Sequence, residues 1–71
     1  MREVELSKEP VELYKILKFE GLVASGGEAK MVISEGQVIL NGEVETRKRK
    51  KIVAGDIIEF GEEKLQITSA A

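Results

Sequence analysis

The stretch SGGEAKMVISEGQVILNGE, residues 25–43, decides the fold, because it contains a helix start, a helix stop and a hairpin turn in succession. The hydroxyl of Ser25 can accept a hydrogen bond from the backbone N–H of Glu28, while the Glu28 carboxylate can reach back to the N–H of Ser25. This reciprocal arrangement, a capping box, predicts that a helix begins here. Gly36 can adopt the left-handed conformation that ends it. The apolar positions between share one helical face: Ala29, Val32 and Ile33.

An extended segment is expected after Gly36. The apolar residues of QVIL lead into Asn41-Gly42. Asn-Gly between apolar residues is the strongest short-range hairpin signal, since both positions of a type I′ turn need positive φ. We therefore expect a two-residue hairpin in which Leu40 faces Glu43.

A strand and another helix are predicted on the N-terminal side. Acidic and apolar residues alternate in REVEL, residues 2–6, which is typical of a half-buried strand. A helix is expected over residues 10–20, because Pro10 suits a first helical position and Gly21 suits a helix end, with Leu22 placed to pack back on the last turn. Only about four residues join this helix to the next, so the two must pack against each other.

Two more strands are predicted after the hairpin. Gly55-Asp56 marks a turn, and the apolar run at residues 57–60 indicates a strand. Residues 65–68 alternate as a last strand, which could pair with residues 2–6. These elements predict an α+β fold, with two short packed helices followed by a small, mainly antiparallel sheet of about four to five strands.

Length and composition limit the function. The 71 residues make one small domain, residues 1–71, which can bury only about 60% of its unfolded surface. The sequence contains neither cysteine nor histidine, which removes disulfides, thiolate metal ligands and the commonest general base. We therefore expect no catalytic residue, no metal site and no cofactor. No apolar run exceeds three residues, which argues against a membrane-spanning helix or secretory signal and favours a cytoplasmic protein.

Positive charge is concentrated in one run, called here the basic strip: Arg47, Lys48, Arg49, Lys50 and Lys51. These are five of the 11 basic residues. The rest of the chain has six basic and 13 acidic residues, which is a formal net charge of −7. Such a run attracts polyanions such as nucleic acid or anionic lipid, whereas the simpler interpretation is a solvated loop or a localisation signal. If the strip continues the hairpin as extended chain, Arg47, Arg49 and Lys51 lie on one face.

Two further features leave alternatives open. Gly26 and Gly27 leave the backbone N–H groups of a helix start unshielded, so a phosphate could sit there; equally, they could simply allow a tight turn between helices. The aromatic residues all lie on apolar patterns: Tyr14, Phe19 and Phe60. Core packing therefore explains Tyr14 better than a base contact does, and recognition would rest on phosphates and shape.

The order of these parts resembles the RNA-binding domain first described in small-subunit ribosomal protein S-four. The matching segments lie within about residues 11–60 and are LYKILKFEGLVAS, GGEAKMVISEGQVILNGE and IVAGDIIEF. A free-standing chain of this length with these motifs is also similar to the small bacterial YbcJ-like proteins. The resemblance implies the fold of that family, the alpha-L RNA-binding motif.

The resemblance also implies a non-catalytic, monomeric RNA-binding protein whose partner is structured ribosomal RNA or the ribosome. Carried over residue by residue, the RNA-binding positions are Ser25, Gly26, Gly27, Lys30, Asn41, Gly42, Arg47, Lys48, Arg49, Lys50 and Lys51. Many members have Arg-Leu-Asp where this chain has Glu12-Leu13-Tyr14, and Arg where it has Gly26. The affinity supplied by those arginines must come from the basic strip or be lower. The rival interpretation is a protein-interaction adaptor that uses an exposed sheet edge, with the basic strip only a solvated loop.

Overall fold

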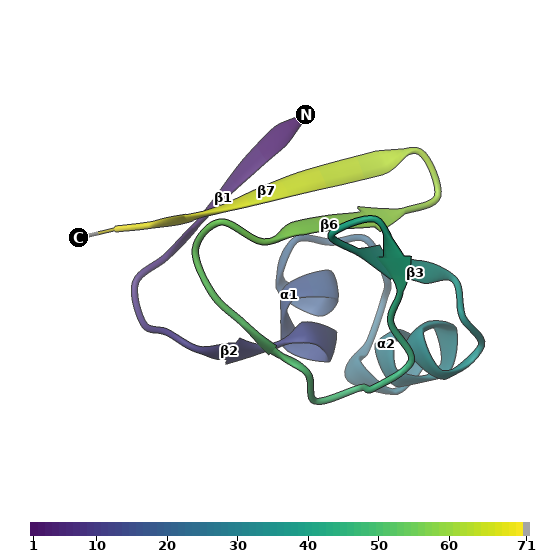
Figure 1. Cartoon of the computed structure of the whole chain (residues 1–71). Helices are drawn as coiled ribbons and strands as arrows, with labels where there is room; N and C mark the ends of the chain where they lie inside the picture. The colour runs from purple at the N-terminus through teal and green to yellow at the C-terminus, as the bar shows by residue number, and fades with distance from the viewer. Residues whose placement is uncertain (71) are drawn as a thin grey trace.

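A five-stranded sheet lies over two short helices in the part of the chain that the structure describes, residues 1–70 (Figure 1). The coordinates are a computed structural model. The helices are α1 (Leu13–Phe19) and α2 (Gly26–Ser34). The strands are β1 (Arg2–Leu6), β2 (Val11–Glu12), β3 (Val38–Leu40), β4 (Glu43–Val44), β5 (Lys51–Ile52), β6 (Ile57–Phe60) and β7 (Glu63–Ser69). Neither helix is long and apolar enough to cross a membrane.

The sheet has the strand order β1-β7-β6-β3-β4, and β2 pairs separately with β5. All its neighbouring strands are antiparallel except β1 and β7, which run parallel with Val4 opposite Ile67. The predicted α+β fold with a mainly antiparallel sheet is confirmed, and so is the pairing of the last strand with residues 2–6. The hairpin is also confirmed, because Leu40 faces Glu43 across a turn in which both Asn41 and Gly42 have positive φ.

The core lies between the helices and the inner face of the sheet (Figure 1). The predicted face of α2 is buried, with Ala29, Val32 and Ile33, and α1 buries Leu13, Ile16 and Leu17 on its own inner face. They meet buried strand residues that include Val38, Ile58 and Leu65. Burying one such large aliphatic side chain contributes about 1.5–3 kcal/mol. The two helices are therefore held by shared core contacts rather than by helix propensity.

The start of α1 differs from the expectation. The helix was expected from Pro10, but it begins at Leu13, because residues 11–12 form β2 and pair with β5. The first amides of α1 are bound from outside the helix: Leu13 N–H donates to the carbonyl of Lys50 at 2.9 Å, and Tyr14 N–H donates to that of Lys48 at 3.2 Å. The basic strip thus satisfies donors that a helix start leaves free.

The end of α1 follows the prediction. Gly21 has φ 73°, its N–H donates to the Lys18 carbonyl, and the N–H of Leu22 donates to the Leu17 carbonyl. This pair of bonds is the Schellman motif, in which a left-handed residue ends a helix. Leu22 is partly buried and packs against the core, as expected.

The capping box of α2 is present with one shift. The Glu28 N–H donates to Ser25 Oγ at 3.1 Å, as predicted. The Glu28 carboxylate, however, accepts from the N–H of Ala24 at 2.7 Å, one residue before the expected Ser25 N–H. Two amides at the helix start are still satisfied reciprocally, so the local stabilisation is the one expected of a capping box.

The cap gives a direct stability prediction. Ser25→Ala removes the acceptor for the Glu28 amide, and we expect it to lower the free energy of unfolding by about 1 kcal/mol. Urea denaturation followed by circular dichroism measures this loss. Ser25→Asn, which keeps a side-chain acceptor, serves as the control and should retain most of the stability. An alanine variant as stable as the wild type would mean that the Glu28 contact alone starts the helix.

Candidate nucleic-acid interface

The basic strip is a turn and not a strand. Lys50 N–H donates to the Arg47 carbonyl at 3.2 Å, and only Lys51 enters a strand, β5. The expectation of alternating faces along extended chain is therefore wrong. The physical reason is that the carbonyls of Lys48 and Lys50 accept from the first amides of α1, so residues 47–50 follow the helix start instead of pairing with a strand.

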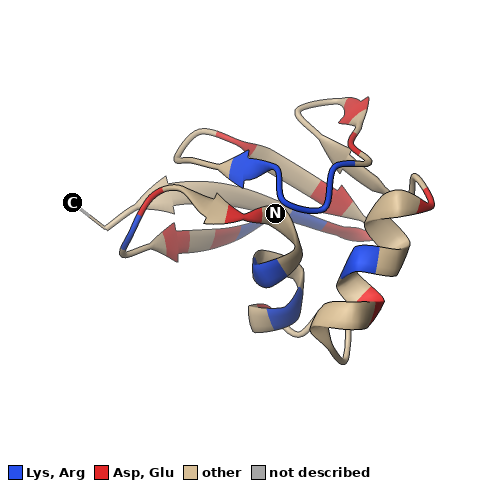
Figure 2. Ribbon diagram, turned by 90° about the horizontal axis from the view of Figure 1, so that it is seen from below, with Lys and Arg blue, Asp and Glu red and all other residues tan. Residues whose placement is uncertain are grey.

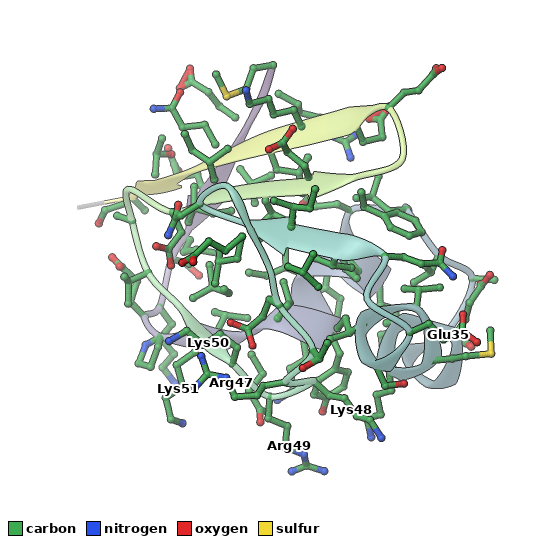
Figure 3. All side chains as sticks on the ribbon, turned by 45° about the vertical axis from the view of Figure 1, so that its right-hand side comes forward. Glu35, Arg47, Lys48, Arg49, Lys50 and Lys51 are labelled. Atoms are coloured by element: carbon green, nitrogen blue, oxygen red, sulfur yellow. The ribbon has the colours of Figure 1, made fainter. Side chains whose placement is uncertain are left out.

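The side chains of the strip divide unevenly around this turn. Four of them line one open hollow of about 440 Å³: Arg47, Arg49, Lys50 and Lys51. Lys48 does not line it, and Figure 3 shows its side chain on the other side of the turn from Lys50 and Lys51. Arg47, Arg49 and Lys51, which were expected on one face of an extended strand, line this hollow together with Lys50. Four cations around one hollow suit the oxygens of a phosphate group.

A buried carboxylate holds the start of the strip. Glu45 is 8% exposed, and its side chain accepts from the Arg47 backbone N–H at 3.0 Å, from Arg47 Nε at 2.9 Å and from a terminal Arg47 nitrogen at 3.2 Å. The side-chain hydrogen bond from Arg47 is the main cause that lowers the pKa of Glu45, although burial acts in the opposite direction. Glu45 therefore stays ionised at neutral pH, and it raises the pKa of Arg47 in return.

Tyr14 brings separate parts of the predicted site together. The centre of its ring lies 4.7 Å from Lys30 Nζ on α2 and 6.0 Å from Arg49 Cζ in the strip. A Cβ placed on Gly26 would lie 3.8 Å from the same ring. Tyr14 is partly buried and packs against the core, which agrees with the core interpretation. The ring nonetheless lies close to the cations of Lys30 and Arg49, and such cation–π contacts favour these positions of the two side chains.

Gly26 and Gly27 are the first two residues of α2. Neither has positive φ, so backbone geometry does not require glycine at either position. Gly26 lies against Tyr14, whereas a Cβ on Gly27 would meet only Ser25 Oγ, at 3.9 Å. The Glu28 carboxylate is bound at this same helix end, where it already supplies negative charge. A phosphate at α2 would therefore have to approach from the side of Lys30.

The hairpin residue Asn41 has a structural task. Its side-chain amide donates to Asp56 Oδ1 at 2.9 Å, and its oxygen accepts from the Ile57 N–H at 2.8 Å. These bonds tie the hairpin turn to the turn before β6. Asn41 also lines a hollow of about 490 Å³ together with Arg47 and Lys50, so the hairpin does adjoin the basic strip. Gly42 supplies the second position of the hairpin turn, with φ 86°.

Two lysines of α1 belong to the same surface and were missed by sequence reasoning. Lys15 Nζ lies 6.0 Å from the centre of the Tyr14 ring and forms an ion pair with Glu12 at 3.4 Å. The Lys18 side chain reaches to 4.0 Å from a Cβ placed on Gly26. Figure 2 shows basic positions of the strip and of both helices on one side of the molecule. The spacing of three residues between these lysines placed them on one helical face and could have indicated this.

Comparison with known proteins shows the family of this chain and agrees with its fold. The chain belongs to the S4 domain family, whose model matches residues 4–68. It is similar to YbcJ of Escherichia coli (strain K12), with 49% identity over 70 residues that cover 97% of this chain and 100% of the relative. A second relative, from Bacillus subtilis (strain 168), has the name "Probable ribosome maturation protein RlbA"; it is 34% identical over 57 residues, 80% of each chain.

A solved structure has the same architecture. The solution structure of E. coli YbcJ, described as revealing an alpha-L motif involved in RNA-binding, matches this fold with a TM-score of 0.73 at 49% identity. The match covers 96% of this chain and 87% of that one. The resemblance read from the sequence motifs is therefore confirmed at the level of family and fold.

Proposed function

We propose that the protein is a non-catalytic RNA-binding protein that contacts the phosphate backbone of structured RNA, with ribosomal RNA as its ligand. The observation that carries this proposal is the hollow ringed by four side chains of the basic strip, in a chain that is acidic elsewhere. Cations that neutralise phosphates release counterions, and this supplies nearly all of the non-specific affinity of proteins for nucleic acids and a large share of the specific affinity. The RNA-binding motif described for YbcJ supports RNA as the ligand, and the ribosome-maturation name of the B. subtilis relative supports ribosomal RNA.

The proposed interface has a centre and a rim. Arg47, Arg49, Lys50 and Lys51 form the centre around the hollow, and Lys30 joins them through the ring of Tyr14. The rim consists of the other positions that the family motif assigns to RNA and the two lysines of α1: Ser25, Gly26, Gly27, Asn41, Gly42, Lys48, Lys15 and Lys18. We propose that the protein acts as a cytoplasmic monomer at this surface.

Phosphate contact and shape dominate recognition in this proposal. Among the described residues, Phe19 is the exposed aromatic side chain, 67% accessible, and Tyr14 is partly buried among cations. Proteins that bind single strands present successive aromatic rings on which neighbouring bases stack. The surface lacks such a row, so a folded RNA with closely spaced phosphates fits it better than a single strand.

Crosslinking in cells, followed by sequencing of the bound RNA, tests the proposed function. Ribosomal RNA should dominate the recovered reads, and the protein should sediment with ribosomes before nuclease treatment and separate from them afterwards. Recovery of one protein partner that persists after nuclease treatment, without enriched RNA, would instead establish the adaptor interpretation.

A charge placed at the start of α2 tests the rim. Gly26→Glu should leave folding nearly intact, because a Cβ there makes only ordinary contact with Tyr14 at 3.8 Å and an acidic residue suits a helix start. RNA affinity should fall about three- to tenfold, since the new charge repels a nearby phosphate. Gly26→Gln, of the same size but uncharged, is the control in fluorescence anisotropy titrations. Equal affinity for Gly26→Glu and Gly26→Gln would restrict Gly26 to helix packing.

A further inference from the structure

One acidic side chain is built into the basic interface, and the proposed function does not use it. Glu45 lines the hollow that Arg47 and Lys50 share with the hairpin. It is the one charged residue that is buried among residues 1–70. A negative charge beside an RNA surface weakens binding by simple electrostatics, so its presence calls for a compensating effect.

We propose that Glu45 is a positioning residue that fixes the basic strip in its RNA-binding shape and thereby raises RNA affinity despite its negative charge. This inference rests on the proposed function, in which the hollow lined by four side chains of the basic strip is the centre of the RNA interface.

The contacts of Glu45 connect the sheet to the strip. Its backbone N–H donates to the Val38 carbonyl at 2.9 Å, which anchors the residue beside β3. Its carboxylate receives both the main-chain amide and the guanidinium of Arg47. The carboxylate therefore sets the direction of the Arg47 peptide as well as that of its side chain. A surface ion pair that involved only the side chain would leave the backbone free.

The chain of hydrogen bonds continues through the strip to α1. The Arg47 carbonyl accepts from Lys50 N–H, and the carbonyls of Lys48 and Lys50 accept from the first amides of α1. The turn is thus held at one end by Glu45 and along its length by the helix start. A glutamine at this position keeps one acceptor oxygen but turns an NH2 group toward an Arg47 donor and lacks the negative charge, so the first anchor is weakened and RNA binding would have to order the turn at an entropic cost.

The two effects of Glu45 predict opposite results, which makes the inference testable. If only charge matters, removal of the carboxylate strengthens binding. If positioning dominates, removal weakens binding, because several strip residues must be ordered again each time RNA binds. Ordering even two backbone residues outweighs one charge that salt screens, so we expect Glu45→Gln to bind about tenfold more weakly at 0.15 M salt.

The matched control is Glu43→Gln. Glu43 is exposed and lies two residues from Glu45. Both glutamates line the hollow between the hairpin and the basic strip, so replacing Glu43 removes an equal charge close to the same surface. The probe is purified bacterial ribosomal RNA, with poly(U) as a single-stranded comparison, titrated against the full chain. We expect Glu43→Gln to bind as tightly as the wild type or slightly more tightly. A Glu45→Gln variant that also binds as tightly as the wild type would overturn the inference.

Amide hydrogen exchange provides a readout that does not depend on RNA. The amides of Leu13 and Tyr14 are protected by the carbonyls of the strip, so they should exchange faster in Glu45→Gln and at wild-type rates in Glu43→Gln. If the wild type binds no RNA, the proposed function fails, while this exchange pattern still decides whether Glu45 positions the strip. Unchanged exchange at both amides would contradict positioning.

A second variant covers the case in which Glu45→Gln does not fold. Arg47→Lys keeps the charge of a side chain that is 70% exposed but cannot donate both guanidinium hydrogen bonds to Glu45. We expect it to weaken RNA binding about three- to tenfold and to expose the same two amides to exchange. Full affinity with unchanged exchange would overturn the inference. Where both variants fold, the double variant should lose less than the product of the two single losses, because both break the same contact.

Discussion

Leu13→Ala should lower the free energy of unfolding by about 2–5 kcal/mol, the largest stability effect that we expect from a single substitution in this chain. Leu13 is fully buried at the first position of α1, where helix, sheet and basic strip meet. Truncation removes the transfer free energy of three carbon atoms and leaves a cavity. A domain of this size has a total stability of only about 4–10 kcal/mol, so the variant should be partly unfolded at 37 °C.

Urea denaturation followed by circular dichroism measures the loss, with Val53→Ala as the control. Val53 is an exposed aliphatic residue, 42% accessible, directly after β5. Its truncation should change stability by no more than about 0.5 kcal/mol. The backbone amide of residue 13 remains in the alanine variant and can still bind Lys50, so a loss near 1 kcal/mol would mean that this hydrogen bond, rather than packing, holds the helix start.

The features that were predicted correctly depend on local interactions. The cap at Ser25 involves residues three positions apart, and the hairpin needs only two adjacent residues with positive φ. Gly21 and Gly36 end their helices for the same local reason, since a residue without Cβ adopts the left-handed conformation at no cost. Such signals lie within a few neighbouring residues, so a single sequence is enough to find them.

The features that were missed depend on distant partners. Residues 11–12 form a strand because β5, forty residues later, is available to pair with them. Lys48 and Lys50 are not extended because their carbonyls bind the amides of α1. The parallel direction of β1 and β7 likewise follows from how the chain returns to the sheet. Propensity and periodicity describe none of these pairings, and tertiary contacts override them.

In the candidate site, too, the local features could be predicted from the sequence and the contacts between elements could not. Composition alone located the basic strip, and the family motif supplied Lys30 and the glycines. The role of Tyr14 could not be read in this way, because its ring is placed by α1 while its neighbours Lys30 and Arg49 come from other elements. The Glu45 contact joins residues only two apart, yet a glutamate in a polar stretch gives no sign that it is buried.

Replacing two cations of the hollow should have the largest effect on RNA affinity. Arg49→Gln/Lys51→Gln removes two side chains that line the hollow, while Arg47 and its bond to Glu45 stay in place. If the interface makes roughly four to six phosphate contacts, log affinity should fall with log salt at a slope of about −3 to −5. The double variant should flatten that slope by about 2 and bind roughly 30- to 100-fold more weakly at 0.15 M salt.

Lys48→Gln/Lys64→Gln is the matched comparison, because it also removes two positive charges but neither residue lines this hollow. Its long-range electrostatic effect should be similar, while its slope should change by about 1 at most. All four side chains are exposed, so neither double variant should change thermal stability much.

Fluorescence anisotropy titrations with ribosomal RNA at several salt concentrations measure both slopes. Equal losses would mean that RNA senses only the total charge of the surface, and no loss in either variant would exclude the hollow from RNA contact. A loss confined to Arg49 and Lys51 would instead show that the turn, held between Glu45 and α1, creates an ordered phosphate site that the same five charges on a free loop could not form.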